Sequence, residues 1–416
     1  MNRNLSGLAV ASAVLLAVSA AAPAFAQTES RTTTVMDRQR PELDPLGGKA
    51  GGFTIYPSVE IEQTYNDNIF ATQNNTIDDF ITTFRPAVRI VSDWNQHYLG
   101  FNGSADVVRY WSNDQEDHET ADLRVDGRID IRRDTNVTGA AGYEKGSEER
   151  GSVNDAGGIT PTEFDVVSLD AGVFNQWNRV SVSADGSIRQ RDFDDVRTTT
   201  GTVNNDDRDR DEYKLDVRGG YEIQEQYEAF AQLILTSVDY LDRLDDNGLN
   251  RDSEGYEIRG GARIDFTGIL FGDVFIGYLN RDYDDPTLRS VDTVVGGLDL
   301  TWNVTPLTTV IGGFTREVSE TTLAAASGTL KTEYKVSVDH ELLRNLILSA
   351  RAAMSTEEFE GIAREDDYLN AGIGAKYMLN RNFSLVLDYD YEERDSNVAG
   401  SDYETNKILL RLRAQL

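Results

Sequence analysis

The sequence predicts an all-β protein: a single antiparallel up-and-down β-barrel of about 18 strands that crosses a membrane. Three observations support this prediction. Long segments alternate between polar and apolar residues, short breaks alternate with long acidic ones, and the chain begins with an export signal.

The alternation marks strands that have one polar and one apolar face. Residues 121–132 carry a charge at every second position, with apolar residues or glycine between the charges. The same pattern recurs in four further windows, 213–223, 256–266, 383–392 and 407–416. Each window keeps its two faces over about ten residues, which is the length of a tilted transmembrane strand and about twice that of a typical globular strand.

The breaks between strands fall into two alternating classes. The short breaks are Asp93–Gln96, Arg132–Thr135, Gln176–Arg179, Gln224–Gln226, Thr267–Ile269, Asn303–Pro306, Leu342–Asn345 and Leu379–Asn382. The long acidic breaks are Asn66–Asp79, Asn113–Glu119, Gly146–Thr162, Asp194–Asp211, Arg243–Ser253, Asp282–Thr287, Ser319–Ser327, Thr356–Asp366 and Glu393–Ser401. This interleaving predicts 18 strands, with short periplasmic turns and long acidic outer loops. Trp94, Trp177 and Trp302 lie at short turns, where an interfacial aromatic girdle is expected.

Not every segment is clear, because residues 106–111, 227–238 and 291–297 alternate poorly. A soluble propeller or β-solenoid is the competing fold. Those folds usually have strands of about five or six residues, or a repeated signature at fixed spacing. The spacing between hairpins here varies and carries no such signature.

The N-terminal segment predicts export. Arg3 precedes an uncharged apolar stretch, Leu5–Ala22, and Ala24-Phe25-Ala26 fits a signal-peptidase site. We expect residues 1–26 to be a signal peptide cleaved near Ala26, because the apolar stretch is short for a membrane anchor and ends in a cleavage signal. Residues 27–52, rich in proline and glycine, are expected to form a flexible periplasmic leader, and residues 53–416 the barrel. The expected location is the outer membrane of a Gram-negative bacterium.

Composition excludes several classes of protein. The 416 residues include 71 acidic and 40 basic ones, a net charge of −31, and no cysteine. The absence of cysteine excludes disulfide scaffolds, thiolate metal sites and cysteine nucleophiles. The acidic excess argues against nucleic acid as a partner, because phosphates would be repelled.

The opening of the predicted barrel resembles a known family. Residues 55–59 read Ile-Tyr-Pro-Ser-Val and residues 65–70 read Tyr-Asn-Asp-Asn-Ile-Phe, followed by Phe84-Arg85-Pro86 and Ser92-Asp93-Trp94. These motifs resemble the putative β-barrel porin type 2 family, and the likeness extends through Tyr110, residues 132–134 and the closing strand with Asn406. The resemblance implies an outer-membrane pore, and some relatives are linked to exopolysaccharide export beside periplasmic polysaccharide-secretion components. The chain departs from the usual aromatic C-terminus by ending in Leu416.

In a barrel of this kind the apolar face meets lipid, so the charged face should line the lumen. A barrel of about 16 to 18 strands is wide enough to hold water. The predicted pore-lining residues are Asp122, Arg124, Asp126, Arg128, Lys214, Asp216, Arg218, Arg259, Arg263, Lys331, Glu333, Lys335, Arg411 and Arg413. The mixture of signs predicts a hydrophilic channel without strong ion selectivity. A narrower eyelet needs an inward-folded loop, and Gly146–Thr162 and Asp194–Asp211 are both long enough.

Enzymatic chemistry has little support in the sequence. Only His97, His118 and His340 offer a near-neutral base, and of these only His118 lies among outer-loop carboxylates. Serine-hydrolase, zinc-protease, phosphate-loop and calcium-loop motifs are missing. We therefore expect no enzyme activity, no cofactor and no dedicated metal site.

The expected function is a passive, water-filled conduit for a secreted polysaccharide or another hydrophilic solute. A general diffusion porin, a structural or adhesive barrel and an outer-membrane enzyme remain the alternatives. The expected partners are outer-membrane lipid and lipopolysaccharide, which acidic outer loops could reach through divalent cations, and periplasmic secretion components.

Overall fold

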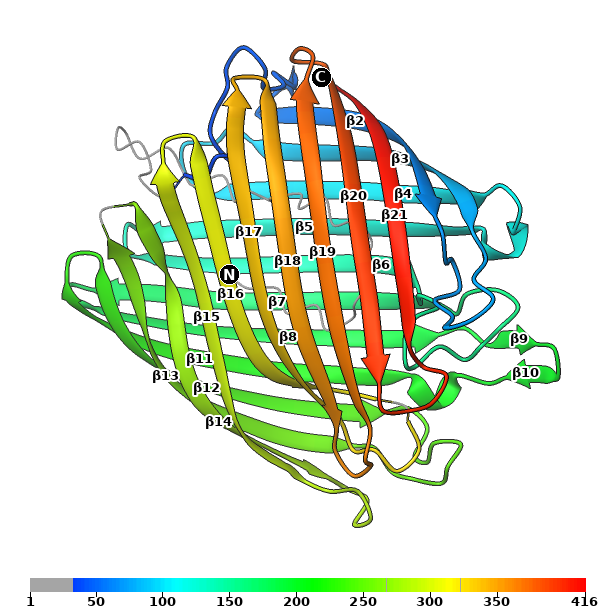
Figure 1. The fold of residues 1–416 in the computed structure, drawn as a ribbon. Helices are drawn as coiled ribbons and strands as arrows, with labels where there is room; N and C mark the ends of the chain where they lie inside the picture. Colours follow the sequence, from blue (N-terminus) through cyan, green and yellow to red (C-terminus); the bar gives the residue numbers. More distant parts are fainter. Residues whose placement is uncertain (1–32, 267, 322) are drawn as a thin grey trace.

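A computed structural model describes residues 33–266, 268–321 and 323–416 of the chain. These residues form a closed antiparallel barrel of 18 long strands (Figure 1). In the described ranges, no helix is both long and apolar enough to cross a membrane. The predicted signal peptide, residues 1–26, lies outside the described residues.

The barrel strands are 12 to 15 residues long. They are β2 (Phe53–Asn66), β3 (Asp79–Ser92), β4 (Tyr98–Tyr110), β5 (His118–Arg132), β6 (Thr135–Ser147), β7 (Glu163–Trp177), β8 (Val180–Phe193), β11 (Arg210–Gln224), β12 (Tyr227–Tyr240), β13 (Ser253–Phe266), β14 (Leu270–Tyr283), β15 (Val291–Thr305), β16 (Thr308–Ser319), β17 (Thr329–Leu343), β18 (Leu346–Phe359), β19 (Glu365–Met378), β20 (Phe383–Ser396) and β21 (Tyr403–Gln415). Five short elements are not members of this ring of long strands. They are the strands β1 (Gly48–Ala50), β9 (Val196–Thr198) and β10 (Gly201–Val203) and the one-turn helices η1 (Asp114–Glu116) and η2 (Asp206–Arg208). Strand β1 pairs with β2, whereas β9 and β10 form their own hairpin.

Consecutive barrel strands pair with each other, and the ring closes where β2 pairs with β21. The register of this seam runs from Ser58 opposite Gln415 to Asn66 opposite Lys407. Ion pairs reinforce the seam on the interior face: Arg411 Nη2 lies 2.5 Å from Glu62 Oε2, and Arg413 Nη1 lies 3.1 Å from Glu60 Oε1. Closure leaves no unpaired barrel edge, which is the condition for placing a sheet in lipid.

The predicted strand count and the two classes of connection are confirmed. Each of the eight short and nine long breaks lies at a connection between two barrel strands, although several overlap the adjoining strand ends, as Thr356–Asp366 and Glu393–Ser401 do. The three poorly alternating windows lie in β4, β12 and β15, where pairing on both sides outweighs a weak local pattern. Trp94, Trp177 and Trp302 are exposed near short turns, and Trp111 is exposed at the long-loop end of β4.

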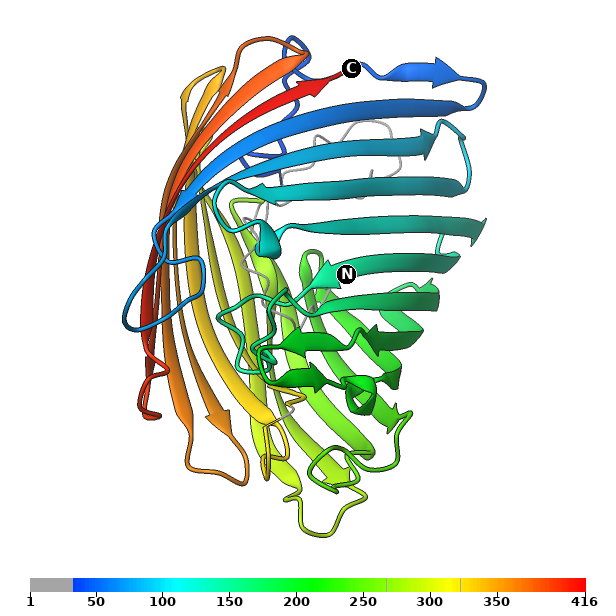
Figure 2. The same ribbon diagram turned by 90° about the vertical axis from the view of Figure 1, so that its right-hand side faces the viewer.

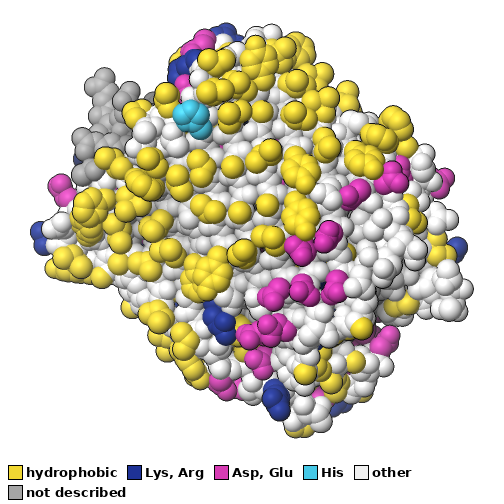
Figure 3. All heavy atoms as spheres, in the orientation of Figure 1, with side chains coloured by type: hydrophobic (Ala, Val, Ile, Leu, Met, Phe, Trp, Pro, Cys, Tyr) yellow, Lys and Arg dark blue, Asp and Glu magenta, His cyan; other side chains and the backbone are white. Residues whose placement is uncertain are grey.

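The apolar side chains form the outer surface instead of a central core. Figure 3 shows hydrophobic side chains over much of the face that carries β15 to β21, with acidic ones gathered toward the long-loop ends. Ile276, near the middle of β14, is 68% exposed. Among the described residues, the one buried apolar cluster is formed by Val35, Ile347 and Met378. Such an outer surface suits contact with lipid.

Residues 33–52 differ from the expectation of a leader without structure of its own. Val35 is fully buried and Arg40 is 2% exposed, and β1 pairs with β2. The partners of Val35 and Arg40 lie on strands roughly 270 to 300 residues further along the chain. The local sequence does not indicate such distant partners, because residues 33–52 show only a high content of proline, glycine and polar residues.

The exposed outer face generates a stability prediction. Replacing Ile276 by arginine puts a charge at the middle of the lipid-facing surface, where the cost is about 2–4 kcal/mol. The interior change Gln232→Arg is the control, because Gln232 lies beside Asp216 and the new charge gains a partner. Denaturant titration in lipid vesicles should show a large loss of stability for Ile276→Arg and a small change for Gln232→Arg. Equal effects would contradict the assigned faces.

Candidate functional site in the barrel interior and outer mouth

The structure places all fourteen predicted pore-lining side chains on one face of their strands, opposite the exposed apolar residues. Asp122, Arg124 and Asp126 alternate with Leu123 and Val125, which are 43% and 45% exposed. The same alternation relates the predicted residues of β11, β13, β17 and β21 to their exposed neighbours. The face that they share is the inner wall of the barrel.

Many charged side chains along this wall form ion pairs with side chains of opposite charge. Arg128 lies 2.8 Å from Asp130, Arg218 lies 2.9 Å from Glu228, and Lys331 lies 3.3 Å from Glu333. Arg263 likewise lies 2.9 Å from Asp273. Asp216 accepts two hydrogen bonds from Gln232 at 2.8 Å. Pairing holds these side chains against the wall and lowers the net field in the lumen.

The ion pairs of Arg351 pass over a glycine in the strand that lies between the partners. Arg351 on β18 reaches Asp390 and Asp388 on β20, crossing β19 at Gly372. A Cβ at Gly372 would collide with Asp390 Oδ1 and Arg351 Nε. Arg124 on β5 also pairs with Asp170 on β7, at 3.3 Å. A sequence pattern shows which face a residue takes, but it does not show these contacts between alternate strands.

Two arginines on the wall also stack on phenylalanines that point inward. The Arg218 guanidinium lies 3.6 Å from the centre of the Phe230 ring, and that of Arg259 lies 4.3 Å from Phe275. The inner wall therefore includes apolar surface under its charges, which the sequence alternation did not reveal. Stacking of this kind restrains a guanidinium while leaving its edge able to bind.

At the outer mouth, the loop of residues 148–162 after β6 crosses toward distant parts of the rim. Arg394 Nη1 on β20 donates to the Gly151 carbonyl at 2.7 Å, although five strands separate β6 from β20 around the ring. Thr321 Oγ1 donates to Asn154 Oδ1 at 3.4 Å, although six strands separate β7 from β16. Figure 2 shows this loop in front of the barrel interior. Of the two loops long enough for an eyelet, residues 148–162 cross the mouth.

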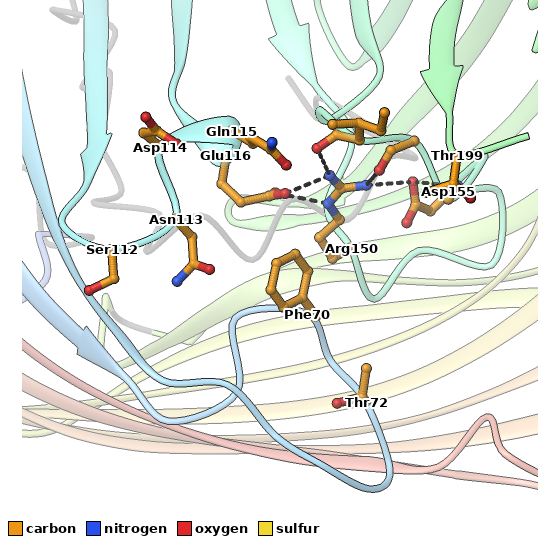
Figure 4. A pocket seen from close by; sticks show the side chains of 13 residues that line it. Phe70, Thr72, Ser112, Asn113, Asp114, Gln115, Glu116, Arg150, Asp155 and Thr199 are labelled. Carbon is orange, nitrogen blue, oxygen red and sulfur yellow. Dashed lines mark hydrogen bonds and ion pairs between the residues drawn. The ribbon is translucent and has the colours of Figure 1, made fainter. Parts of the chain in front are cut away.

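Arg150 fixes the base of this loop. Its Nη2 lies 2.6 Å from Glu116 Oε1, its Nε donates to Glu116 Oε2 at 2.8 Å, and its Nη1 donates to the Gly158 carbonyl at 2.9 Å. Both side chains of the ion pair are largely buried, at 9% and 4% exposure. Figure 4 shows Arg150 above Phe70, at the edge of a cavity of about 610 Å³ between the first four long loops. Arg208 pairs with Glu148 and so ties the following long loop to this one.

Burial raises the pKa of two carboxyl groups in these loops. It raises the pKa of Asp155 above the usual range, against the opposing effect of Arg150. Burial also raises the pKa of Asp209 to about 6, helped by the nearby charges of Asp192, Asp206 and Asp242. The Asp209 carboxylate accepts the Phe193 N–H at 2.7 Å, which only partly offsets these effects.

The motif at residues 65–68 closes the outer end of the seam. Asp67 accepts hydrogen bonds from the Asn406 backbone and side-chain nitrogens at 2.7 and 2.8 Å. Asn68 is 2% exposed and donates to the carbonyls of Thr72 and Glu404 at 2.9 Å. These residues therefore join the first long loop to the last strand.

The three histidines lie apart from one another. The His118 ring is 2.8 Å from the Glu116 carbonyl, the His97 backbone N–H donates to Asp130 at 3.2 Å, and the His340 ring is 3.0 Å from the Thr308 hydroxyl. Within the described ranges, no group of three or more histidine and carboxylate side chains could hold a metal ion.

Removing Arg150 should release the loop that crosses the mouth. Arg150→Ala leaves Glu116 buried without its partner, a loss that typically costs roughly 3–5 kcal/mol. We expect a glutamate-specific protease, added to the folded protein, to cut the loop at Glu148 or Glu149 much faster in this variant. Arg243→Ala, in an exposed part of another long loop, is the control and should cut at the wild-type rate. Equal cutting of the two variants would show that Arg150 does not hold the loop.

Asp209 should make the outer loops more stable in mild acid. Its pKa is higher in the folded protein than in an unfolded chain, so the folded state holds the extra proton, and stability falls as pH rises from about 4 to about 6. Asp209→Asn should therefore raise the denaturant midpoint at pH 7.5 and leave it nearly unchanged at pH 4. A gain of the same size at both values would contradict the raised pKa.

The chain was compared with known protein families, curated proteins and solved structures. The family described as Putative beta-barrel porin 2 matches residues 40–416. No curated protein matches the chain. Among solved structures, OpdK of Pseudomonas aeruginosa, crystallised with vanillate, is 10% identical, with 87% of this chain and 99% of OpdK covered and a TM-score of 0.42. OpdO of the same organism is 12% identical, covering 88% and 97%, with a TM-score of 0.45.

A mutant of the ferric enterobactin receptor PfeA, also from Pseudomonas aeruginosa, is 7% identical, with 87% of this chain and 80% of that receptor covered and a TM-score of 0.46. The family match, which covers nearly the whole described chain, is the decisive comparison. With a closed ring of 18 strands and an apolar outer surface, the chain belongs to the Putative beta-barrel porin 2 family of outer-membrane β-barrels.

Proposed function

We propose that the protein is a passive conduit for hydrophilic solutes across the outer membrane. The observation that carries this proposal is the charged face of β5, β11, β13, β17 and β21, which lies opposite their exposed apolar residues and so faces the interior of the closed barrel. Barrels of 16 to 18 strands generally enclose an aqueous channel. The proposal includes export of the chain with removal of a signal peptide near Ala26, and it includes no enzymatic role.

The charges on the wall favour weak ion selectivity. Ion pairs such as Arg218 with Glu228 and Arg124 with Asp170 cancel much of each other's field. Lys335 is an exposed charge on the inner face of β17, near the middle of the strand. It is therefore a suitable position at which to change the field along the conduit.

The cargo that we propose is a secreted polysaccharide or another hydrophilic solute. Polysaccharide export is supported by the resemblance of the opening motifs to relatives linked to that process, and periplasmic secretion components are its proposed partners. A general diffusion porin is the second candidate. The loop of residues 148–162, held across the mouth by Arg394 and Thr321, favours small solutes over a bulky polymer.

Contact with lipopolysaccharide is also proposed. Outward carboxylates lie at the long-loop ends of the strands, where Tyr143 donates to Asp165 at 2.7 Å and Tyr278 donates to Asp292 at 2.8 Å. Divalent cations would join such carboxylates to lipid phosphates. A structural or adhesive barrel predicts the same surface and differs in passing no current.

Planar-bilayer recording tests the conduit and its wall together. The purified, folded protein should give steady single-channel currents, and a persistent absence of current would contradict the conduit. Lys335→Glu should shift the reversal potential in a salt gradient toward greater cation selectivity, and Lys335→Gln should shift it about half as far, because the first change alters charge by two and the second by one. An unchanged reversal potential in both variants would contradict placement of Lys335 in the conducting lumen. Release of a labelled polysaccharide from vesicles separates the two candidate cargoes.

A further inference from the structure

The described part of the leader lies inside the short-turn rim of the barrel and follows it. Asn303, at the end of β15, donates to the Thr33 carbonyl at 3.2 Å, and the Val35 N–H donates to Thr309 Oγ1 on β16 at 2.9 Å. Directly before β1, the Gly47 N–H donates to the carbonyl of Leu416. Residues 33–47 therefore extend along the inside of the rim from β15 to the seam.

Two side chains seat this segment. Val35 is fully buried and packs with Ile347 of β18 and Met378 of β19. Arg40 is 2% exposed and lies 2.7 Å from Glu341 of β17, a carboxylate that is itself only 5% exposed. An apolar contact and a buried ion pair at one place are costly to separate.

Arg40 also gives the segment its own shape. Its Nη2 donates to the Val35 carbonyl at 2.8 Å, and its backbone N–H donates to the Asp44 carboxylate at 2.5 Å. The N–H groups of Leu43 and Asp44 both donate to the Arg40 carbonyl at 2.7 Å. The segment is thus a compact turn built on one arginine, and not an extended strand lying loosely on the wall.

Two short connections of the barrel contact the other side of residues 33–44. Arg344, between β17 and β18, donates to Glu42 at 2.8 Å, and Arg381, between β19 and β20, donates to the Pro41 carbonyl at 2.9 Å. The segment thus contacts each strand from β15 to β19 and two short turns on the inside of the rim. Met36, between these anchored residues, is 42% exposed.

We propose that residues 33–44 form a built-in constriction at the short-turn mouth and set the size of solute that passes. The inference rests on the proposed conduit and adds where its periplasmic restriction lies. Residues 33–44 hold three acidic and two basic side chains, so the turn sorts solutes by size more than by charge. Narrowing by a seated segment limits conductance in the same way as a narrower pore.

The seat is tested by thiol labelling, since the chain has no cysteine of its own. Val35→Cys and Met36→Cys place a single thiol at a fully buried and an exposed neighbouring position. A water-soluble maleimide should label the Met36→Cys variant rapidly and the Val35→Cys variant slowly in the folded protein, and both variants rapidly after unfolding. Equal labelling of the two folded variants would overturn the proposed seat.

The constriction is tested by conductance. Deleting residues 27–44 should raise single-channel conductance by roughly half or more and admit larger neutral polymers. Arg40→Gln should raise it in the same direction, whereas Gln39→Glu, which lowers net charge by the same amount at an exposed position, should leave it unchanged. Equal conductance of the full and shortened proteins would overturn the constriction. If neither protein passes current, the conduit itself fails and this inference falls with it.

Discussion

The requirement that every backbone hydrogen-bonding group be paired within lipid governs the rest of this structure. A sheet meets the requirement only by closing on itself. The chain does so by pairing β2 with β21, and it supports that pairing at several levels. Arg411 and Arg413 bind the glutamates of β2 on the inner face, and Asp67 binds Asn406 at the outer end. The residues that resemble family motifs at the start of the barrel are thus partly the residues that close it.

Closure also explains how a chain with a mean hydropathy of −0.45 and a net charge of −31 folds without a conventional core. Each strand turns its apolar residues outward, so its polar residues must meet one another inside. There they pair across neighbouring strands or, as with Arg351 and Asp390, over the glycine of an intervening strand. Buried arginines form similar contacts at both mouths of the barrel. Arg150 and Arg394 hold the outer loop of residues 148–162, and Arg40 holds the leader.

The sequence was enough to predict the parts of the fold that depend on local periodicity. Alternation within each strand gave the inner and outer faces, and the lengths of the breaks gave the strand count, even where β4, β12 and β15 alternate poorly. Contacts between distant segments could not be predicted in this way. Arg40 binds Glu341, some 300 residues later in the sequence, and Arg394 binds Gly151, more than 240 residues earlier. No periodic pattern records such pairs, so the leader looked flexible and two loops were equal candidates for the mouth.

The most direct test of the inward-facing polar wall is the accessibility of thiols along a single strand. Cysteine is introduced in turn at Lys214, Leu215, Asp216 and Val217 of β11, near the middle of the barrel wall. A charged, water-soluble thiol reagent added to protein in lipid vesicles should label the positions of Lys214 and Asp216 and leave those of Leu215 and Val217 unlabelled. Labelling of the four positions without alternation, or only at Leu215 and Val217, would contradict the barrel's inside-out arrangement.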